Sequence, residues 1–224
     1  MKPKNLIPAF SLLGITLLSV PAAHAADAAA TGWYGGISVG QSKAQDFSAS
    51  DFDSTLAQGG LTASGTSVDD TDTGWKLFAG YQFNRYFAVE GGYLDLGRFD
   101  AHTTVTAVDG SPITPTSVDA SVKVKDGLFI DAVGILPITE QFSAFGKLGV
   151  YSLKTEISAS AGGRSASDSA RNSDLTYGLG VNYAFTKELA LRAEWERFHK
   201  VGDSDKTGQS DVDLLSLGLT YRFY

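Results

Sequence analysis

The chain contains no cysteine, has only three histidines, and carries fewer basic than acidic residues. With 18 Lys and Arg against 25 Asp and Glu, its formal charge is −7, which excludes nucleic acid as a partner because a binder needs a basic stripe to displace counterions. No His or Cys cluster indicates zinc, and no Gly-rich turn between a strand and a helix indicates a nucleotide. We therefore predict no metal and no cofactor. The length of 224 residues fits one domain or a short pair.

The first 25 residues have the features of an export signal. Lys2 and Lys4 precede an apolar run, Leu6–Val20, and small residues lead up to Ala25 as in an A-x-A cleavage site. The run is shorter than the ~20 residues that span a bilayer, so a cleaved signal peptide over residues 1–25 is favoured over a membrane anchor. An exported chain without disulfides must close its fold by hydrogen bonding and packing.

Beyond the signal, no stretch is long and apolar enough for a membrane helix, and the mean hydropathy of −0.04 suggests a soluble domain. The periodicity indicates otherwise, because apolar and polar or small residues alternate with a period of two. Each alternating stretch is about as long as the ~9–11 residues of a tilted transmembrane strand. The stretches are Gly32–Ser42, Thr73–Asn84, Tyr86–Arg98, Ser121–Leu136, Gln141–Leu153, Asp174–Phe185, Leu189–Phe198 and Asp211–Tyr224.

Short and long connections alternate strictly between these stretches. The short ones are Asn84-Arg85, Pro137–Glu140 and Thr186–Glu188, and the long ones, rich in Ser, Thr, Asp and Gly, are Lys43–Asp72, Phe99–Ala120, Lys154–Ser173 and His199–Ser210. Outer-membrane barrels have tight periplasmic turns and longer external loops. We therefore predict that residues 26–224 form one all-β domain, an eight-stranded antiparallel up-and-down transmembrane β-barrel.

The chemistry of the two faces separates a membrane barrel from a soluble one. The predicted outer face carries Trp, Leu, Val, Tyr and Phe and almost no charge, whereas charges gather on the opposite face. Two aromatic belts are predicted at the membrane interfaces, one near the short turns (Trp33, Phe83, Phe87, Phe142, Phe185, Tyr221, Phe223) and one near the long loops (Trp75, Tyr93, Tyr151, Tyr177, Trp195).

Several segments carry a family resemblance. They are Gly32-Trp33-Tyr34-Gly35-Gly36, Gly80-Tyr81-Gln82-Phe83-Asn84-Arg85-Tyr86, Glu90 to Gly97, Leu136 to Glu140, Phe145 to Tyr151, Leu191 to Phe198, and Tyr221-Arg222-Phe223. The chain resembles the transmembrane domain of the OmpA family of Gram-negative outer-membrane proteins. The resemblance covers the strands of residues 32–224 but not the loops.

The resemblance implies a location in the outer membrane of a Gram-negative bacterium, in contact with membrane lipid and lipopolysaccharide. Because the chain ends at Tyr224, we expect no peptidoglycan-binding domain after the barrel. The outward residues Leu219, Tyr221 and Phe223 resemble the signal that the barrel-assembly machinery reads, although the extra Tyr224 departs from the usual ending. Periplasmic chaperones are expected partners during assembly.

By strand parity, Glu90, Lys147, Arg192 and Glu194 point into the lumen. In the family, a comparable network of ion pairs is proposed to act as a gate. The favoured interpretation is a structural network, since buried charges are costly unless paired and since eight-stranded barrels are filled by side chains. A gated conductance for small solutes is the alternative.

Two further regions carry candidate functional groups. The acidic segment Lys43–Asp72 is expected to be a flexible surface loop, with recognition of a host, phage or neighbouring cell, or cation bridging to lipopolysaccharide, as alternatives. His102 and His199, the latter close in sequence to Ser204 and Asp205, raise the possibility of a lipid A-modifying enzyme. Because these groups lie on loops rather than on rigid strands, we predict no enzymatic activity.

These observations favour a structural outer-membrane barrel that supports the envelope and presents four surface loops, with a narrow, porin-like conductance as an added property. A surface adhesin or receptor acting through its long loops, whose partner the sequence does not name, is the main alternative.

Overall fold

The computed structural model describes residues 31–45, 48–203 and 208–223, so the predicted signal peptide lies outside the described residues. Over this part of the chain, strands account for nearly all of the regular structure, and the single helix is too short and polar to cross a bilayer. The elements are β1 (Gly32–Ala44), α1 (Ala49–Gln58), β2 (Leu61–Asp69), β3 (Thr71–Asn84), β4 (Phe87–Asp95), β5 (Gly97–Val108), β6 (Ser111–Pro137), β7 (Phe142–Ala161), β8 (Arg164–Ala184), β9 (Leu189–Asp203) and β10 (Gly208–Arg222).

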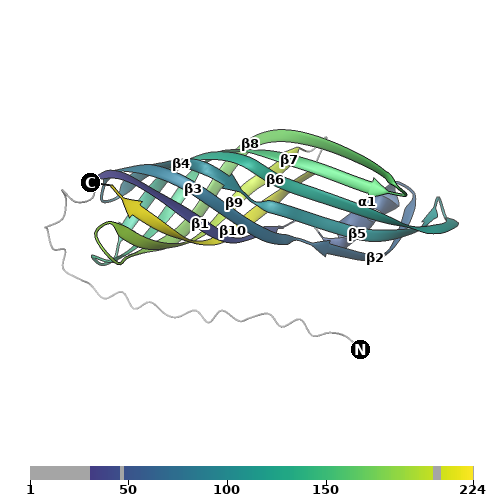
Figure 1. Cartoon of the computed structure of the whole chain (residues 1–224), viewed down its shortest axis with the longest axis horizontal. Helices are drawn as coiled ribbons and strands as arrows, with labels where there is room; N and C mark the ends of the chain where they lie inside the picture. The colour runs from purple at the N-terminus through teal and green to yellow at the C-terminus, as the bar shows by residue number, and fades with distance from the viewer. Residues whose placement is uncertain (1–30, 46–47, 204–207, 224) are drawn as a thin grey trace, which may run out of the picture.

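The strands close into a ring. The hydrogen-bonded order is β2-β5-β6-β4-β3-β1-β10-β9-β8-β7, and a further pairing of β6 with β7 closes the sheet on itself. The closed ring therefore contains eight antiparallel strands, β1, β3, β4, β6, β7, β8, β9 and β10, with β2 and β5 outside it (Figure 1). The predicted fold class is confirmed.

All four predicted long loops are wrong over most of their length, because strands continue into them; in His199–Ser210, β9 runs on to Asp203 and β10 begins at Gly208. The segment Phe99–Ala120 forms most of β5 and the start of β6, and Lys154–Ser173 forms the ends of β7 and β8 around Gly162 and Gly163. The acidic segment Lys43–Asp72, expected to be flexible, contains α1 and β2. On β5 one face is buried, but small and polar members such as Ala101 and Thr103 weaken the hydropathy contrast between the faces, so the segment reads as a loop, although its Thr and Val residues still favour strands.

These continuations form a second structural unit, here called the extracellular sheet. It consists of β2, β5, the part of β6 before Lys125, the part of β7 after Lys154 and the part of β8 before Arg171. Helix α1 lies against this sheet, and the Thr66 hydroxyl of β2 donates a hydrogen bond to Asp53 of the helix. Figure 1 shows the extracellular sheet and α1 at the end of the molecule opposite the chain's C-terminus.

The predicted strand Tyr86–Arg98 is interrupted at Leu96. Gly97 has a φ of +84°, a backbone conformation that residues with a side chain rarely adopt. The Gly97 N–H donates a hydrogen bond of 2.8 Å to Asp95 Oδ1. β4 ends before this kink and β5 begins after it, and both pair with β6. The kink marks the point where the chain leaves the barrel wall and enters the extracellular sheet.

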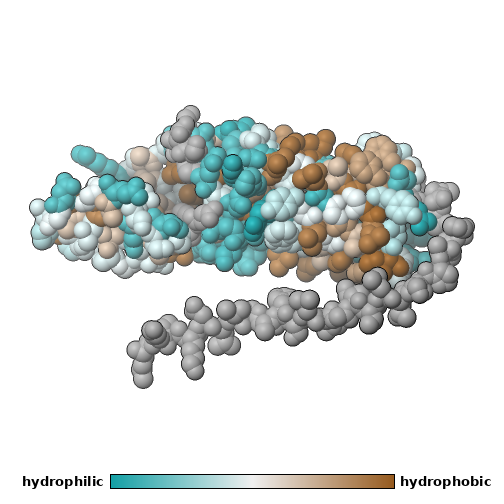
Figure 2. All heavy atoms as spheres, turned by 180° about the vertical axis from the view of Figure 1, so that it is seen from behind, coloured by the Kyte–Doolittle hydropathy of each residue, from teal (hydrophilic) through white to brown (hydrophobic). Residues whose placement is uncertain are grey.

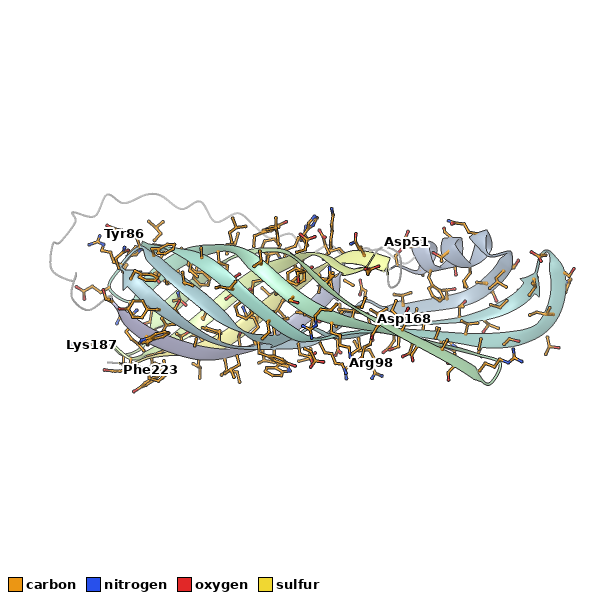
Figure 3. The ribbon with its side chains drawn as sticks, turned by 90° about the horizontal axis from the view of Figure 1, so that it is seen from above. Asp51, Tyr86, Arg98, Asp168, Lys187 and Phe223 are labelled. Carbon is orange, nitrogen blue, oxygen red and sulfur yellow. The ribbon has the colours of Figure 1, made fainter. Side chains whose placement is uncertain are left out.

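The outward side chains form an apolar band around the barrel. On β3, β6 and β10 this band runs from Trp75 to Phe83, Leu128 to Leu136, and Leu215 to Phe223, the same number of steps on each. Eight residues at ~3.3 Å each cover about 26 Å along a strand, or roughly 20 Å along the membrane normal after a tilt of ~40°. Figure 2 shows this brown band beside a band of hydrophilic residues. In Figure 3, Tyr86, Lys187 and Phe223 lie at the end formed by the short turns, and Asp51 lies at the opposite end.

One aromatic residue does not belong to the predicted belts. Tyr151 points into the barrel, is 2% exposed, and donates a hydrogen bond from its hydroxyl to the carbonyl of His199. Its neighbour Phe198 meets it edge to face with ring centroids 5.6 Å apart. The assignment failed because Tyr151 shares the parity of Lys147, which faces the lumen.

Candidate functional site

The centre of the lumen holds a network of buried ion pairs, here called the charge network: Lys76, Glu90, Asp131, Lys147, Arg192, Glu194 and Glu196. Their side chains are at most 3% exposed. They come from β3, β4, β6, β7 and β9, so the network joins most of the barrel wall across its interior. Three cations face four carboxylates, which gives the network a formal charge of −1.

Lys147 contacts three of the four carboxylates of the network. Its Nζ lies 3.1 Å from Asp131 Oδ2 and 2.7 Å from Glu194 Oε1, and it also contacts Glu196 Oε1. Lys76 Nζ lies 2.5 Å from Glu194 Oε1 and also contacts Glu196 Oε2. The two lysines therefore share both glutamates, which stand two residues apart on β9 and point to the same side.

Arg192 links the remaining carboxylate to this group. Its Nη1 lies 2.7 Å from Glu90 Oε1 and its Nε lies 2.9 Å from Glu194 Oε2. Glu90 also accepts a hydrogen bond of 2.8 Å from the Tyr34 hydroxyl. Glu194 thus connects all three cations, so the arrangement is one continuous network rather than separate pairs.

Aromatic rings fill the space around the charges. The Arg192 guanidinium carbon lies 4.2 Å from the centroid of Phe145 and 4.8 Å from that of Phe78. Lys147 Nζ lies 5.4 Å from the centroid of Phe129, within the range of a cation–π contact. These rings exclude water, and so they strengthen each electrostatic contact beside them.

A second layer of inward side chains closes the lumen toward the extracellular side. We call it the apolar layer, because its side chains are apolar and at most 2% exposed. Its members are Leu94, Leu96, Val124, Leu153, Phe198, Val212 and Leu214. Parity reasoning treated the lumen as polar along its whole length and missed this layer. The signal in the sequence is Leu94, Leu96 and Leu153, which share the parity of lumen charges on the same strands.

The structure brings together the four lumen residues that the sequence singles out, Glu90, Lys147, Arg192 and Glu194. The predicted network of four omits three further inward charges. Lys76, Asp131 and Glu196 also carry charge at inward parity, so parity alone was enough to find them. What it could not provide was the register between neighbouring strands, which decides which inward charges meet.

The other candidate residues lie outside the lumen. Leu219, Tyr221 and Phe223 are about half exposed on the outer surface, at 47%, 49% and 55%, and the Phe223 N–H donates a hydrogen bond of 2.9 Å to the Trp33 carbonyl. Both histidines lie on strands and not on loops, so the placement expected from the sequence is wrong. On β5, His102 Nδ1 lies 2.5 Å from Asp119 Oδ1, and on β9, His199 Nδ1 lies 2.9 Å from Asp211 Oδ1.

Ser204 and Asp205 fall outside the described residues. Over residues 31–45, 48–203 and 208–223, no group of three His, Asp or Glu side chains is arranged to hold a metal ion.

Known proteins similar to this chain identify its family. The OmpA-like transmembrane domain matches residues 28–224. The chain belongs to the OmpA-like transmembrane domain family. It is therefore a barrel of the Gram-negative outer membrane, as the sequence predicts.

Among its curated relatives, this OmpA-like barrel is 28% identical over 193 residues to outer membrane protein A of Shigella flexneri, which covers 85% of this chain and 48% of that protein. It is 29% identical over 194 residues to outer membrane protein A of Klebsiella pneumoniae, covering 85% of this chain and 51% of that protein. The chain thus spans about half the length of these relatives. Among solved structures, it is similar to Ail, the attachment invasion locus protein of Yersinia pestis, at 22% identity and a TM-score of 0.45, with 86% of this chain and 99% of that chain covered.

Proposed function

We propose that this OmpA-like barrel is a closed structural element of the outer membrane that carries a folded extracellular sheet. The observation that supports this most strongly is the double closure of the lumen. The charge network fills the centre of the barrel, and the apolar layer fills the end next to the extracellular sheet. An ion that crossed the barrel would have to separate buried ion pairs and also enter a dehydrated apolar layer, each at a cost of several kcal/mol.

The double closure argues against the gate that the family resemblance implies. Exchange of ion-pair partners among Glu90, Lys147, Arg192 and Glu194 would rearrange only the charge network. Leu94, Leu153 and Leu214 would still close the lumen above it. We therefore propose that the network acts as a structural brace, and that partner exchange by itself opens no continuous path.

Conductance measurements test this proposal. The full chain, refolded and inserted into a planar bilayer, is expected to give no steady single-channel current. The variant Leu153→Gly/Leu214→Gly thins the apolar layer and leaves the charge network intact, and it is also expected to remain closed. Only its combination with Lys147→Ala is expected to conduct. A steady ohmic current from the unaltered protein would contradict a closed barrel.

A second proposed role concerns the extracellular sheet. β6, β7 and β8 continue from the barrel wall into the sheet, as in the 27-residue β6, and β5 pairs with β6 and β2 with β5, so the sheet is held rigidly above the membrane. A rigid surface preserves its recognition geometry at a smaller entropic cost than a flexible loop. We propose that this sheet, rather than mobile loops, is the surface that a partner outside the cell would contact.

Binding to cells tests this role. The comparison is between the unaltered protein and a variant in which residues 46–69, which hold α1 and β2, are replaced by a short Gly-Ser linker. If the sheet is the recognition surface, cells that display the variant lose adhesion while the amount of folded protein at their surface stays the same. Equal adhesion would leave the barrel with the structural role alone.

The C-terminal residues support a further part of the proposal, namely recognition by the barrel-assembly machinery during insertion. Leu219, Tyr221 and Phe223 form an outward apolar row on β10 and just beyond it. We expect Phe223→Ser to lower the yield of inserted protein in cells while leaving refolding of the purified protein in detergent unchanged. A similar loss in both settings would mean that Phe223 contributes only to stability.

A further inference from the structure

The extracellular sheet has two edges, whereas the barrel below it is closed. The pairings give the sheet the strand order β2-β5-β6-β7-β8. β8 pairs with β9 only from Thr176 onward, so among the described residues the segment Arg164–Arg171, here called the edge segment, has β7 as its one strand neighbour. An unpaired edge presents backbone N–H and C=O groups that can pair with another strand.

The other edge of the sheet, at β2, is protected against further pairing. The register of β2 against β5 shifts twice, and Gly65, at the second shift, has a φ of +69°. Helix α1 lies against the same strand, where the Thr66 hydroxyl donates a hydrogen bond to Asp53. Bulges and a covering element are devices by which natural sheets block an edge.

Among the described residues, the edge segment has neither a bulge nor a helix against it. β7 and β8 pair up to Ala161 and Arg164 without a register shift, and β8 contains no proline and no lysine. The residues from Arg164 to Ser169 are all exposed. In Figure 3, Asp168 lies on this hairpin, apart from Asp51 of α1. The edge segment is thus a regular, accessible strand outside the membrane.

The turn before β8 determines which backbone groups face the free edge. Gly162 and Gly163 have positive φ values of 56° and 79° and form a two-residue hairpin turn. The residues that close such a turn, Ala161 and Arg164, form a hydrogen-bonded pair, and these pairs alternate along an antiparallel ladder. Even-numbered residues of the edge segment therefore direct their backbone groups toward β7, and odd-numbered residues direct theirs toward the free edge.

Two charged side chains of the edge segment have no charged partner. Arg164 and Asp168 stand four residues apart and so lie on the same face of β8. Among the described residues, neither side chain forms an ion pair, and the Asp168 carboxylate accepts a hydrogen bond from the N–H of the adjacent Ser169. Like charges across two strands oppose pairing, whereas opposite charges favour it. The edge segment therefore selects a strand with complementary charges.

The edge segment is complementary to itself. Two copies of it satisfy each other's backbone groups only when odd-numbered residues meet odd-numbered residues, because these face the edge. Antiparallel pairing about Ala166 meets this condition and sets Arg164 of each copy opposite Asp168 of the other. Asp168 and Arg171 differ by three positions, so no register of this kind pairs them. Pairing about Ala166 is therefore the one allowed register within the edge segment that places opposite charges together.

We propose that the edge segment pairs with the edge segment of a second copy of this chain in the outer membrane of an adjacent cell. The twofold axis of antiparallel edge pairing is perpendicular to the sheet, so it reverses the direction of the barrel as well as that of the strand. Two barrels related in this way cannot lie in one membrane with the same orientation. The pairing therefore joins two membranes that face each other.

The height of the edge segment above the membrane sets the distance between the two membranes. Ala166 stands nine residues from the outward Leu175. Nine residues at ~3.3 Å cover about 30 Å along the strand, or roughly 23 Å along the membrane normal after a tilt of ~40°. The two apolar bands would then face each other across roughly 45 Å. Such a short pairing is weak between two free copies and becomes effective where many copies face each other on two cells.

Disulfide trapping tests the register. The chain has no native cysteine, so Ala166→Cys introduces a single thiol at the twofold axis, where paired Cα atoms ~4.5–5.5 Å apart are within reach of a disulfide. The refolded full chain in detergent is expected to form a covalent dimer under mild oxidation. Ala170→Cys, on the same face of β8, is the matched control, because the two copies of that position would lie about 26 Å apart. Equal dimer yields from the two variants would overturn the register.

Charge exchange tests whether the partner is a second copy. In the Ala166→Cys background, Arg164→Asp and Asp168→Arg each set like charges opposite each other at both symmetric pairs. Each is expected to lower the dimer yield at least about fivefold, or ~1 kcal/mol. A mixture of the two variants restores opposite charges at both pairs and is expected to recover a mixed dimer. A mixture that dimerises no better than its components would reject pairing between copies of the edge segment.

Clumping of cells tests where the second copy lies. Cells with truncated lipopolysaccharide that display the chain are mixed with differently labelled cells that lack it, and the mobility difference between unboiled and boiled samples on a gel verifies that the barrel is folded. We expect clumps only between cells that both display the chain. Clumps that include both populations equally, or no clumps among the displaying cells, would overturn the assignment to a second copy on an adjacent cell.

This self-association is separable from the proposed contact of the extracellular sheet with a partner of another kind. The variant in which residues 46–69 are replaced keeps β8, so it is expected to clump with itself as the unaltered chain does, whether or not it adheres to other cells. Loss of self-clumping in this variant would place the pairing at β2 and would reject the edge segment.

Discussion

Replacement of Lys147 by methionine is the most informative perturbation of the charge network. Lys147 contacts three carboxylates, those of Asp131, Glu194 and Glu196, and its side chain is fully buried. In the variant, two cations face four carboxylates, so the formal charge of the network changes from −1 to −2. Removal of one partner from a buried ion pair costs ~3–5 kcal/mol, because the remaining charge stays buried without compensation. Methionine has a similar volume, so the cavity contribution is small.

Urea unfolding of the refolded protein in lipid vesicles, followed by tryptophan fluorescence, measures this cost. Lys147→Met is expected to lower the free energy of unfolding by about 3–5 kcal/mol, whereas Lys123→Met, at the surface of the neighbouring strand, is expected to change it little. Adding Glu196→Gln to Lys147→Met restores the network charge to −1 and is expected to recover part of the loss. If Lys147→Met unfolds at the same urea concentration as the unaltered protein, the network does not brace the barrel.

Three further predictions concern other parts of the chain. Gly149→Val is expected to reduce refolding yield sharply, because a Cβ at Gly149 would lie 2.1 Å from the Ile130 carbonyl oxygen and 2.2 Å from Asp131 Oδ1. The comparison is Gly134→Val, where a Cβ would lie 3.9 Å from the Gly146 carbonyl oxygen, and equal yields would refute the steric argument. Replacement of residues 46–69 by a short linker is expected to preserve the gel mobility shift. The ring excludes β2, and the Ala44 N–H donates a hydrogen bond of 2.9 Å to the Asp70 carbonyl, so the two ends of the replaced segment lie close together. Loss of the shift would show that the ring depends on this segment. Lys154 and Lys125 lower the pKa of Glu156 from its ordinary value of 4.5 to about 2, so its stabilising contribution is present above pH 4.5 and is lost as the pH falls toward 2. The stability difference between the unaltered protein and Glu156→Gln should vanish over that interval. A constant difference would contradict the ion pair.

The sequence was sufficient for the barrel because the bilayer imposes one rule on every strand. Lipid-facing positions such as Leu215, Leu217 and Leu219 must be apolar, while the positions between them are free to vary. This period of two survives without any knowledge of tertiary contacts. The same rule explains why the lumen residues Glu90, Lys147, Arg192 and Glu194 could be selected in advance.

The rule fails where the bilayer ends. In the extracellular sheet the buried face includes small and polar residues such as Ala101, Thr103 and Thr155, so hydropathy no longer separates the two faces, and hairpins such as that around Asp109 and Gly110 read as polar loops. Parity also left the fully buried Leu94, Leu96 and Leu153 without a role, because an inward apolar residue violates the simple division into an apolar outside and a polar inside.

The central claim is that alternate residues of each strand face lipid and a closed lumen. Because the chain has no native cysteine, single cysteines placed at each position from 214 to 219 can carry a spin label without any background. The accessibility of each label to oxygen, which partitions into lipid, is then compared with its accessibility to a water-soluble nickel complex. We expect oxygen access to alternate, high at Leu215, Leu217 and Leu219 and low at Leu214, Ser216 and Gly218, with little access of the nickel complex at any of them. High nickel access at the inward positions would show an open, water-filled lumen, and uniform access along the strand would contradict the barrel itself.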